Sequence, residues 1–160
     1  MDGHSIRLDI EDGNGITKGG RFRKTPVPLY FEKDILRMVG GKGPEERLVS
    51  VKEATVRKGV YVVCKKAGIN QNGRGTHGFR HSYCRRRLQE LLKEKGIYAE
   101  GKAMMDRIMN NRDVGRDADY GILTTQDQSV YMQLKEVIDQ VHSEIGHGKD
   151  RWDLGERYLR

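Results

Sequence analysis

An apolar stripe near the C-terminal end of the chain constrains the fold more than any other feature. Five apolar side chains recur at helical spacing, namely Val130, Leu134, Val137, Val141 and Ile145. Residues three and four apart lie on one face of a helix, so this spacing predicts an amphipathic helix over 126–145. A helix of this kind is stable only when its apolar face is covered. The chain must therefore contain other elements that pack against it.

The rest of the pattern predicts a small antiparallel sheet followed by helices. Residues 4–10 alternate between polar and apolar, which is typical of a half-buried strand. Gly19 and Gly20, between two short runs, indicate a tight hairpin turn. Further helices are expected at 31–39, at 50–67 with Ser50 as N-cap and Glu53 as its capping-box partner, at 77–95 behind Thr76, at 102–109, and at 152–159. The predicted fold class is α+β, mainly α: a small N-terminal β-hairpin sheet followed by a helical core.

Composition excludes several classes of protein. The chain has 160 residues, of which 36% are hydrophobic, enough to bury a core and too many for a disordered chain. No apolar run approaches the ~20 residues of a membrane span, and no apolar signal segment opens the chain. Two cysteines, Cys64 and Cys84, cannot form a disulfide framework or a four-cysteine zinc site. We therefore expect a cytoplasmic protein with no membrane partner.

The positive charge is concentrated in one segment. Residues 65–95 carry nine basic and two acidic groups, a net charge of +7, which equals the formal charge of the whole chain. A basic patch of this kind favours a phosphate-bearing partner, because neutralising phosphates releases counterions. The alternative is a solvated basic helix face. Residues 96–145 carry five basic and nine acidic groups, net −4, and are expected to face away from a polyanion.

Four short motifs carry residues suited to phosphate chemistry. Lys18 lies at the predicted hairpin turn, His77 and Arg80 open a predicted helix, Gly146-His147 ends the amphipathic helix, and Tyr158 lies near the C-terminus. In this order they resemble the catalytic domain of the tyrosine recombinases, the phage-integrase family. The resemblance covers about 4–95 and 126–160. Each motif is weak alone, and the shared order makes the resemblance specific.

The resemblance implies a site-specific DNA recombinase of a mobile genetic element. Such an enzyme breaks and rejoins double-stranded DNA through a covalent 3′-phosphotyrosine, acts as a tetramer on two DNA sites, and is associated with the nucleoid. Tyr158 would be the nucleophile and Lys18 the general acid, while His77, Arg80 and His147 would stabilise charge on the phosphate. No metal or other cofactor is expected, because the phosphodiester energy is kept in the tyrosine linkage. The residues expected to bind DNA are Arg21, Arg23, Lys65, Lys66, Arg74, Arg85 and Arg86.

The chemistry agrees with these residue types. A guanidinium is planar, permanently charged and binds phosphate through two hydrogen bonds, which suits Arg80 to a phosphate whose charge grows during cleavage. A histidine such as His147 can donate to the phosphate or accept the nucleophile's proton. The Tyr158 phenol is a poor nucleophile while protonated and requires activation by neighbouring groups.

Three departures from the family pattern shape the expected domain organisation. The family has a further catalytic arginine well before the hairpin lysine, whereas only Arg7 precedes Lys18 here. We therefore expect residues 1–160 to be a partial catalytic domain that cleaves DNA poorly alone and lacks the family's N-terminal core-binding domain. The interval from Arg80 to His147 is longer than usual, so 96–125 is expected to be an inserted surface subdomain. The interval from His147 to Tyr158 is also slightly long.

Other interpretations remain open at this point. A type IB topoisomerase uses the same side-chain chemistry, and an inactive DNA-binding relic would explain the missing arginine. His77, His81 and Cys84 share a helical face and could be imagined as zinc ligands, but no fourth ligand is evident. Packing into the core is favoured for His81 and Tyr83. Trp152 is interpreted as a core residue or as a lid over His147.

Overall fold

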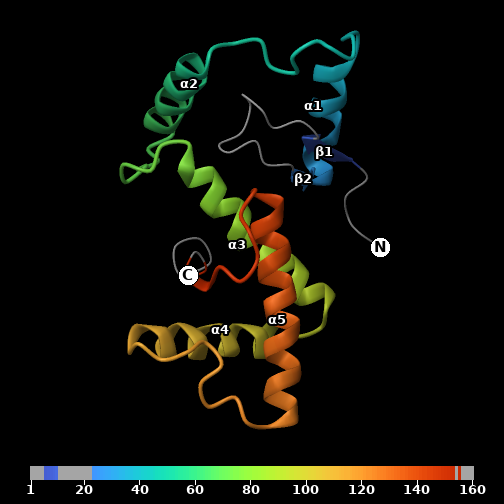
Figure 1. The fold of residues 1–160 in the computed structure, drawn as a ribbon. Coiled ribbons are helices and arrows are strands. Elements are labelled where there is room, and N and C mark those ends of the chain that lie inside the picture. Colours follow the sequence, from blue (N-terminus) through green and yellow to red (C-terminus); the bar gives the residue numbers. More distant parts are fainter. Residues whose placement is uncertain (1–5, 11–22, 154, 156–160) are drawn as a thin grey trace. The chain divides into compact units, whose positions relative to one another are not determined.

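The computed structural model describes residues 6–10, 23–153 and 155 (Figure 1). Within these residues the chain is mainly helical, with five helices and one two-stranded antiparallel sheet. The chain divides into two compact units, residues 1–79 and 80–160. The predicted α+β class with mainly α content is confirmed at this level.

The first unit contains the sheet. Strand β1 (Arg7–Ile10) pairs antiparallel with β2 (Arg23–Pro26), and Leu8 lies opposite Thr25. The pairing continues one step further, because the Val27 N–H donates to the Ile6 carbonyl at 2.9 Å. The predicted N-terminal antiparallel sheet is therefore present, while the predicted turn at Gly19 and Gly20 lies outside the described residues.

Two helices of the first unit follow the sheet. Helix α1 (Leu29–Val39) begins directly after Pro28, and helix α2 spans Glu53–Lys66. The expected N-cap Ser50 is wrong, because Lys52 occupies that position and its carbonyl accepts the first helical N–H groups, those of Thr55 and Val56. Neither helix has a buried residue among those described.

The second unit is a helical core. Helix α3 (His77–Glu94) enters it at Arg80, and helices α4 (Tyr98–Asp113) and α5 (Thr125–Glu144) complete it. Helix α5 begins at an N-cap, Thr124, whose hydroxyl accepts the Asp127 N–H at 3.0 Å. All five residues of the apolar stripe are buried, which confirms the predicted amphipathic helix: Val130, Leu134, Val137, Val141 and Ile145.

The segment 96–125, expected to be an inserted surface subdomain, contributes its helix to this core. Met104, Met105, Ile108 and Met109 of α4 are buried against the other helices. At Gly101 a Cβ atom would lie only 2.8 Å from a Leu92 methyl carbon, so the absence of a side chain there lets α4 approach α3 closely. Helix α4 is also longer than the predicted 102–109.

Trp152 belongs to the hydrophobic core of the second unit, next to Tyr131 of α5. Its side chain is buried, and its ring stacks on Tyr131 with centroids 5.7 Å apart and an interplanar angle of 25°. Of the two interpretations offered by the sequence, the structure favours core packing. Trp152, Asp153 and Gly155 are helical, in agreement with a helix beginning at 152, and residues 156–160 lie outside the described part.

Candidate functional site

The His-x-x-Arg motif forms the first turn of α3. His77 is its first residue and is exposed, whereas Arg80 is half-buried. Residues three apart on a helix lie on one side of it, so the two side chains leave the same side of the turn. No acidic residue lies in this turn. The partial positive charge of the helix N-terminus is therefore reinforced by the Arg80 guanidinium, with the His77 imidazole as a further polar group, an arrangement that attracts anions.

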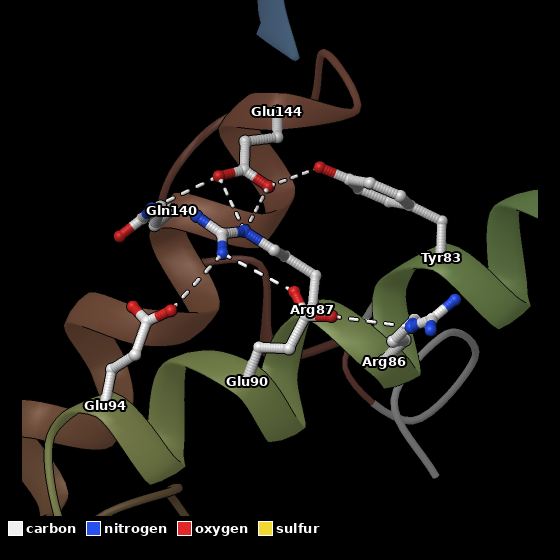
Figure 2. A network of polar contacts seen from close by, with 7 residues as sticks. All are labelled: Tyr83, Arg86, Arg87, Glu90, Glu94, Gln140 and Glu144. Carbon is white, nitrogen blue, oxygen red and sulfur yellow. Dashed lines mark hydrogen bonds and ion pairs between the residues drawn. The ribbon is translucent and has the colours of Figure 1, made fainter. Parts of the chain in front are cut away.

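A buried polar network ties α3 to the end of α5 within the second unit (Figure 2). Glu144 is its centre: the Tyr83 hydroxyl donates to Glu144 Oε2 at 2.6 Å, Arg87 Nε donates to both carboxylate oxygens at 3.2 Å, and Gln140 Nε2 donates to Oε1 at 3.1 Å. We call Tyr83, Arg87, Gln140 and Glu144 the Glu144 network. The Arg87 and Glu144 side chains are only 7% and 8% exposed. A buried charge pair is tolerated when its hydrogen-bonding groups are satisfied, as they are here.

Arg87 also faces two further carboxylates on its own helix. Its Nη1 lies 3.6 Å from Glu90 and 3.9 Å from Glu94. Arg87 is therefore buried among three carboxylates. Arg87 directly follows Arg85 and Arg86 in the sequence, but unlike these two exposed arginines it is buried and has a role inside the fold.

The direction of α3 against α5 follows from two polar links. Near the start of α3, Tyr83 reaches Glu144 at the last residue of α5; just beyond the end of α3, Lys95 Nζ lies 3.0 Å from Glu136 Oε2. The two helices therefore run in opposite chain directions, and they cross at an oblique angle (Figure 1). Arg80, about one turn before Tyr83, and His147, three residues after Glu144, consequently lie at the same end of this pair.

The Gly-His motif is built by the end of α5. Gly146 has φ of 79°, a conformation that favours glycine, and its N–H donates to the Ser143 carbonyl at 2.9 Å. The His147 N–H then donates to the His142 carbonyl at 2.7 Å. These two bonds form a Schellman motif, which fixes the backbone of His147 over the last turn of α5. The motif thus places His147 beside His142.

Histidine 142 is a buried partner of His147 that the sequence reasoning missed. The two Nδ1 atoms are 3.3 Å apart and the ring centroids 5.5 Å apart. His142 is only 1% exposed, and burial lowers its pKa below the ordinary value. The signal was present in the sequence, because His142 and Glu144 interleave with the apolar stripe and a polar group on a buried face requires a partner.

Of the expected DNA-contacting residues, five have described side chains and all five are exposed. Lys65, Lys66 and Arg74 belong to the first unit, while Arg85 and Arg86 lie on α3 in the second. Arg86 forms an ion pair with Glu90 at 3.4 Å. The backbone of Arg23 lies in β2, but its side chain is outside the described part. Lys18, Arg21 and Tyr158 lie outside the described residues altogether.

Two potentially reactive groups near the start of α3 are held in their protonated forms. Burial, followed by the hydrogen bond to Glu144, raises the pKa of the Tyr83 phenol far above its ordinary value. Burial likewise raises the pKa of the fully buried Cys84 thiol to about 11. A nucleophile must lose its proton, so neither group is suited to that role.

A comparison with known protein families, with curated proteins and with solved structures finds no match for this chain. Among the residues that the structure describes, no cluster of three or more His, Cys, Asp or Glu is arranged to hold a metal ion. No helix in the described part is both long and apolar enough to cross a membrane.

The buried His142 makes the stability of the fold dependent on pH. Its folded-state pKa is below the unfolded value of 6.5. As the pH falls through 6.5, the unfolded chain takes up the proton first, so the free energy of unfolding decreases until the pH passes the lower folded-state pKa. The charged groups that act on the ring are Asp139 and Asp153, which oppose this shift, and Arg151, which adds to it.

We expect His142→Phe to flatten this dependence. One proton changes the free energy of unfolding by at most about 1.4 kcal/mol per pH unit. Urea unfolding of wild type and variant between neutral and mildly acidic pH measures the difference. If the free energy of unfolding depends on pH below 6.5 in the same way for wild type and for His142→Phe, His142 is not the group responsible for the dependence.

Proposed function

We propose that this chain is the catalytic region of a tyrosine-type DNA recombinase that breaks and rejoins double-stranded DNA. The observation that carries the proposal is the link between α3 and α5 through the Glu144 network, with the two helices running in opposite chain directions. The tyrosine-recombinase resemblance requires Arg80 and His147 to act on one phosphate, although 67 residues separate them in the sequence. The pairing supports this requirement, because both residues lie at the same end of the two helices.

The start of α3 supports a phosphate as the ligand. Its N-terminal turn carries His77 and Arg80 and no acidic residue. A phosphodiester gains negative charge on its non-bridging oxygens as a fifth oxygen approaches phosphorus, and fixed cationic donors stabilise that charge. Removing one such donor costs about 10²–10³-fold in rate in other enzymes. The exposed Arg85 and Arg86 on the same helix would add contacts to the DNA backbone.

The proposed reaction proceeds in two steps, cleavage and rejoining. The Tyr158 oxygen, having lost its proton, attacks phosphorus; the bond from phosphorus to the 5′-oxygen breaks, and Lys18 protonates that oxygen. The enzyme then holds a 3′-phosphotyrosine and the DNA a free 5′-hydroxyl. Attack by a 5′-hydroxyl from a second duplex reverses the chemistry and joins the new strand. The full enzyme would act as a tetramer on two DNA sites in the nucleoid.

The environment of Tyr83 helps to select the nucleophile. The chain has seven tyrosines, and among those that the structure describes Tyr83 is hydrogen-bonded to Glu144. Its hydroxyl donates to Glu144 and its raised pKa keeps the proton in place. Tyr83 is therefore proposed as a structural residue and Tyr158 as the nucleophile.

A pair of matched variants tests the proposal. The protein is expressed from its complete reading frame and mixed with a pool of nicked DNA duplexes whose central segment is randomised. Cleavage next to the nick releases a short oligonucleotide, which diffuses away. Because the strand can then no longer be rejoined, the covalent complex is trapped. Wild type and Tyr83→Phe are expected to form an adduct that survives denaturation, whereas Tyr158→Phe is expected to bind DNA without forming one.

Three results would separate the alternatives. Adduct formation by Tyr158→Phe would remove Tyr158 as nucleophile. DNA binding by wild type with no adduct on any duplex would indicate a DNA-binding relic. Relaxation of supercoiled plasmid by a monomer, with no sequence preference, would indicate a type IB topoisomerase instead.

A further inference from the structure

The contact between His142 and His147 restricts where their protons can be. Their Nδ1 atoms face each other at 3.3 Å. A neutral imidazole has one N–H and one lone pair, so a hydrogen bond between two Nδ1 atoms requires one to donate and the other to accept. The Schellman bonds at Gly146 and His147 hold the two residues in this position.

The surroundings of His142 decide which nitrogen donates. His142 is 1% exposed, and its Nε2 is buried with no hydrogen-bond partner among the described residues. Because burial lowers its pKa, the ring is neutral near pH 7 and carries a single proton. A buried N–H without an acceptor costs more than a buried lone pair without a donor. The proton of His142 is therefore on Nδ1, where it has a partner.

We propose that His142 is a positioning residue: its Nδ1–H donates to Nδ1 of His147 and thereby holds His147 as the tautomer protonated on Nε2. This inference rests on the proposed function and decides between two roles for His147. With a proton on Nε2, His147 donates a hydrogen bond to a non-bridging oxygen of the scissile phosphate. It does not accept the proton of Tyr158, which passes to water.

The tautomers can be read directly by nitrogen NMR. Long-range ¹H–¹⁵N correlation spectra of the ¹⁵N-labelled full chain at neutral pH distinguish Nδ1–H from Nε2–H for each of the five histidines. The signals of the pair are assigned by their loss in single variants. We expect His142 to be the Nδ1–H tautomer and His147 the Nε2–H tautomer. The opposite pair of tautomers would overturn the proposal.

Two substitutions test whether His142 causes the tautomer of His147. His142→Phe keeps a ring of similar size and removes the donor, so His147 is expected to become a mixture of tautomers. The side-chain amide of His142→Asn can occupy the place of Nδ1 and donate, so the Nε2–H tautomer of His147 is expected to return. If His147 keeps its wild-type signature in His142→Phe, His142 does not position it and the proposal fails.

The cleavage assay separates this proposal from the proposed function. We expect His142→Phe to slow adduct formation about 10–100-fold at unchanged DNA affinity, as for other residues that orient a functional histidine, and His142→Asn to recover most of the rate. Wild type that forms an adduct but shows the reversed tautomers would overturn the positioning role alone. Wild type with the expected tautomers but no adduct would overturn the recombinase function, and with it the phosphate as the target of His147.

Discussion

Replacing Glu144 with leucine is expected to lower the free energy of unfolding by about 3–5 kcal/mol. The substitution leaves the Arg87 guanidinium, which is 7% exposed, without its closest carboxylate, and it leaves the Tyr83 hydroxyl without its acceptor. The buried guanidinium then loses the carboxylate that accepts its Nε–H hydrogen bonds, and only the more distant Glu90 and Glu94, 3.6 and 3.9 Å from Nη1, remain to balance its charge. Urea unfolding monitored by circular dichroism measures the loss.

The physical cause is isolated by removing the Tyr83 hydroxyl and the Arg87–Glu144 ion pair in one variant. The triple variant Tyr83→Phe, Arg87→Met, Glu144→Leu replaces three of the four members of the network with apolar side chains of similar shape and keeps the exposed Gln140. This variant is expected to lie within about 1 kcal/mol of wild type. Arg85→Met, on the exposed part of α3, is the matched control, with an expected change below about 0.5 kcal/mol. A Glu144→Leu protein as stable as this control would show that the network contributes little to the fold.

Replacing Arg80 with alanine is expected to slow adduct formation on nicked DNA by at least about 10²–10³-fold. The reason is that its guanidinium would stabilise charge that develops only during the attack on phosphorus, so the effect falls on the rate of cleavage and less on DNA affinity. Single-turnover trapping with saturating protein measures this rate.

Two further variants sharpen this test. Arg80→Lys keeps the charge but loses the planar fork of donors, so it is expected to recover only part of the rate. Arg85→Ala, also on α3, is expected to weaken DNA binding and reduce its salt dependence without slowing cleavage at saturation. Equal effects of Arg80→Ala and Arg85→Ala on the cleavage rate would contradict a specific role for Arg80.

The elements that follow from local pattern were predictable from the sequence. The apolar stripe and the residues flanking it place α5 to within a residue at each end, because period and caps are local properties. The start of α3 after Thr76 and the end of α2 before Gly68 are predicted for the same reason. The start of α2 was predicted wrongly, which shows the limit of prediction from local pattern. Ser50 has a side chain suited to an N-cap, but the helix begins at Glu53.

The contacts between distant segments were not predictable in the same way. Arg87 looks like one of three equivalent arginines in the sequence, and only packing against Glu144, 57 residues later, distinguishes it. The pairing of His142 with His147 requires the Schellman geometry at Gly146, which a pattern of residue types does not specify. Helix α4 begins at Tyr98, earlier than predicted, and its first turn approaches α3 where Gly101 meets Leu92.

Mapping the covalent DNA adduct by mass spectrometry tests the proposed recombinase chemistry most directly. The protein, expressed from its complete reading frame, is trapped on nicked duplexes, digested with protease and nuclease, and the peptide that carries the nucleotide is sequenced. We predict a 3′-phosphate bonded to Tyr158, with a free 5′-hydroxyl on the released strand. A nucleotide attached to any other residue, attachment through a 5′-phosphate, or no adduct at all would contradict it.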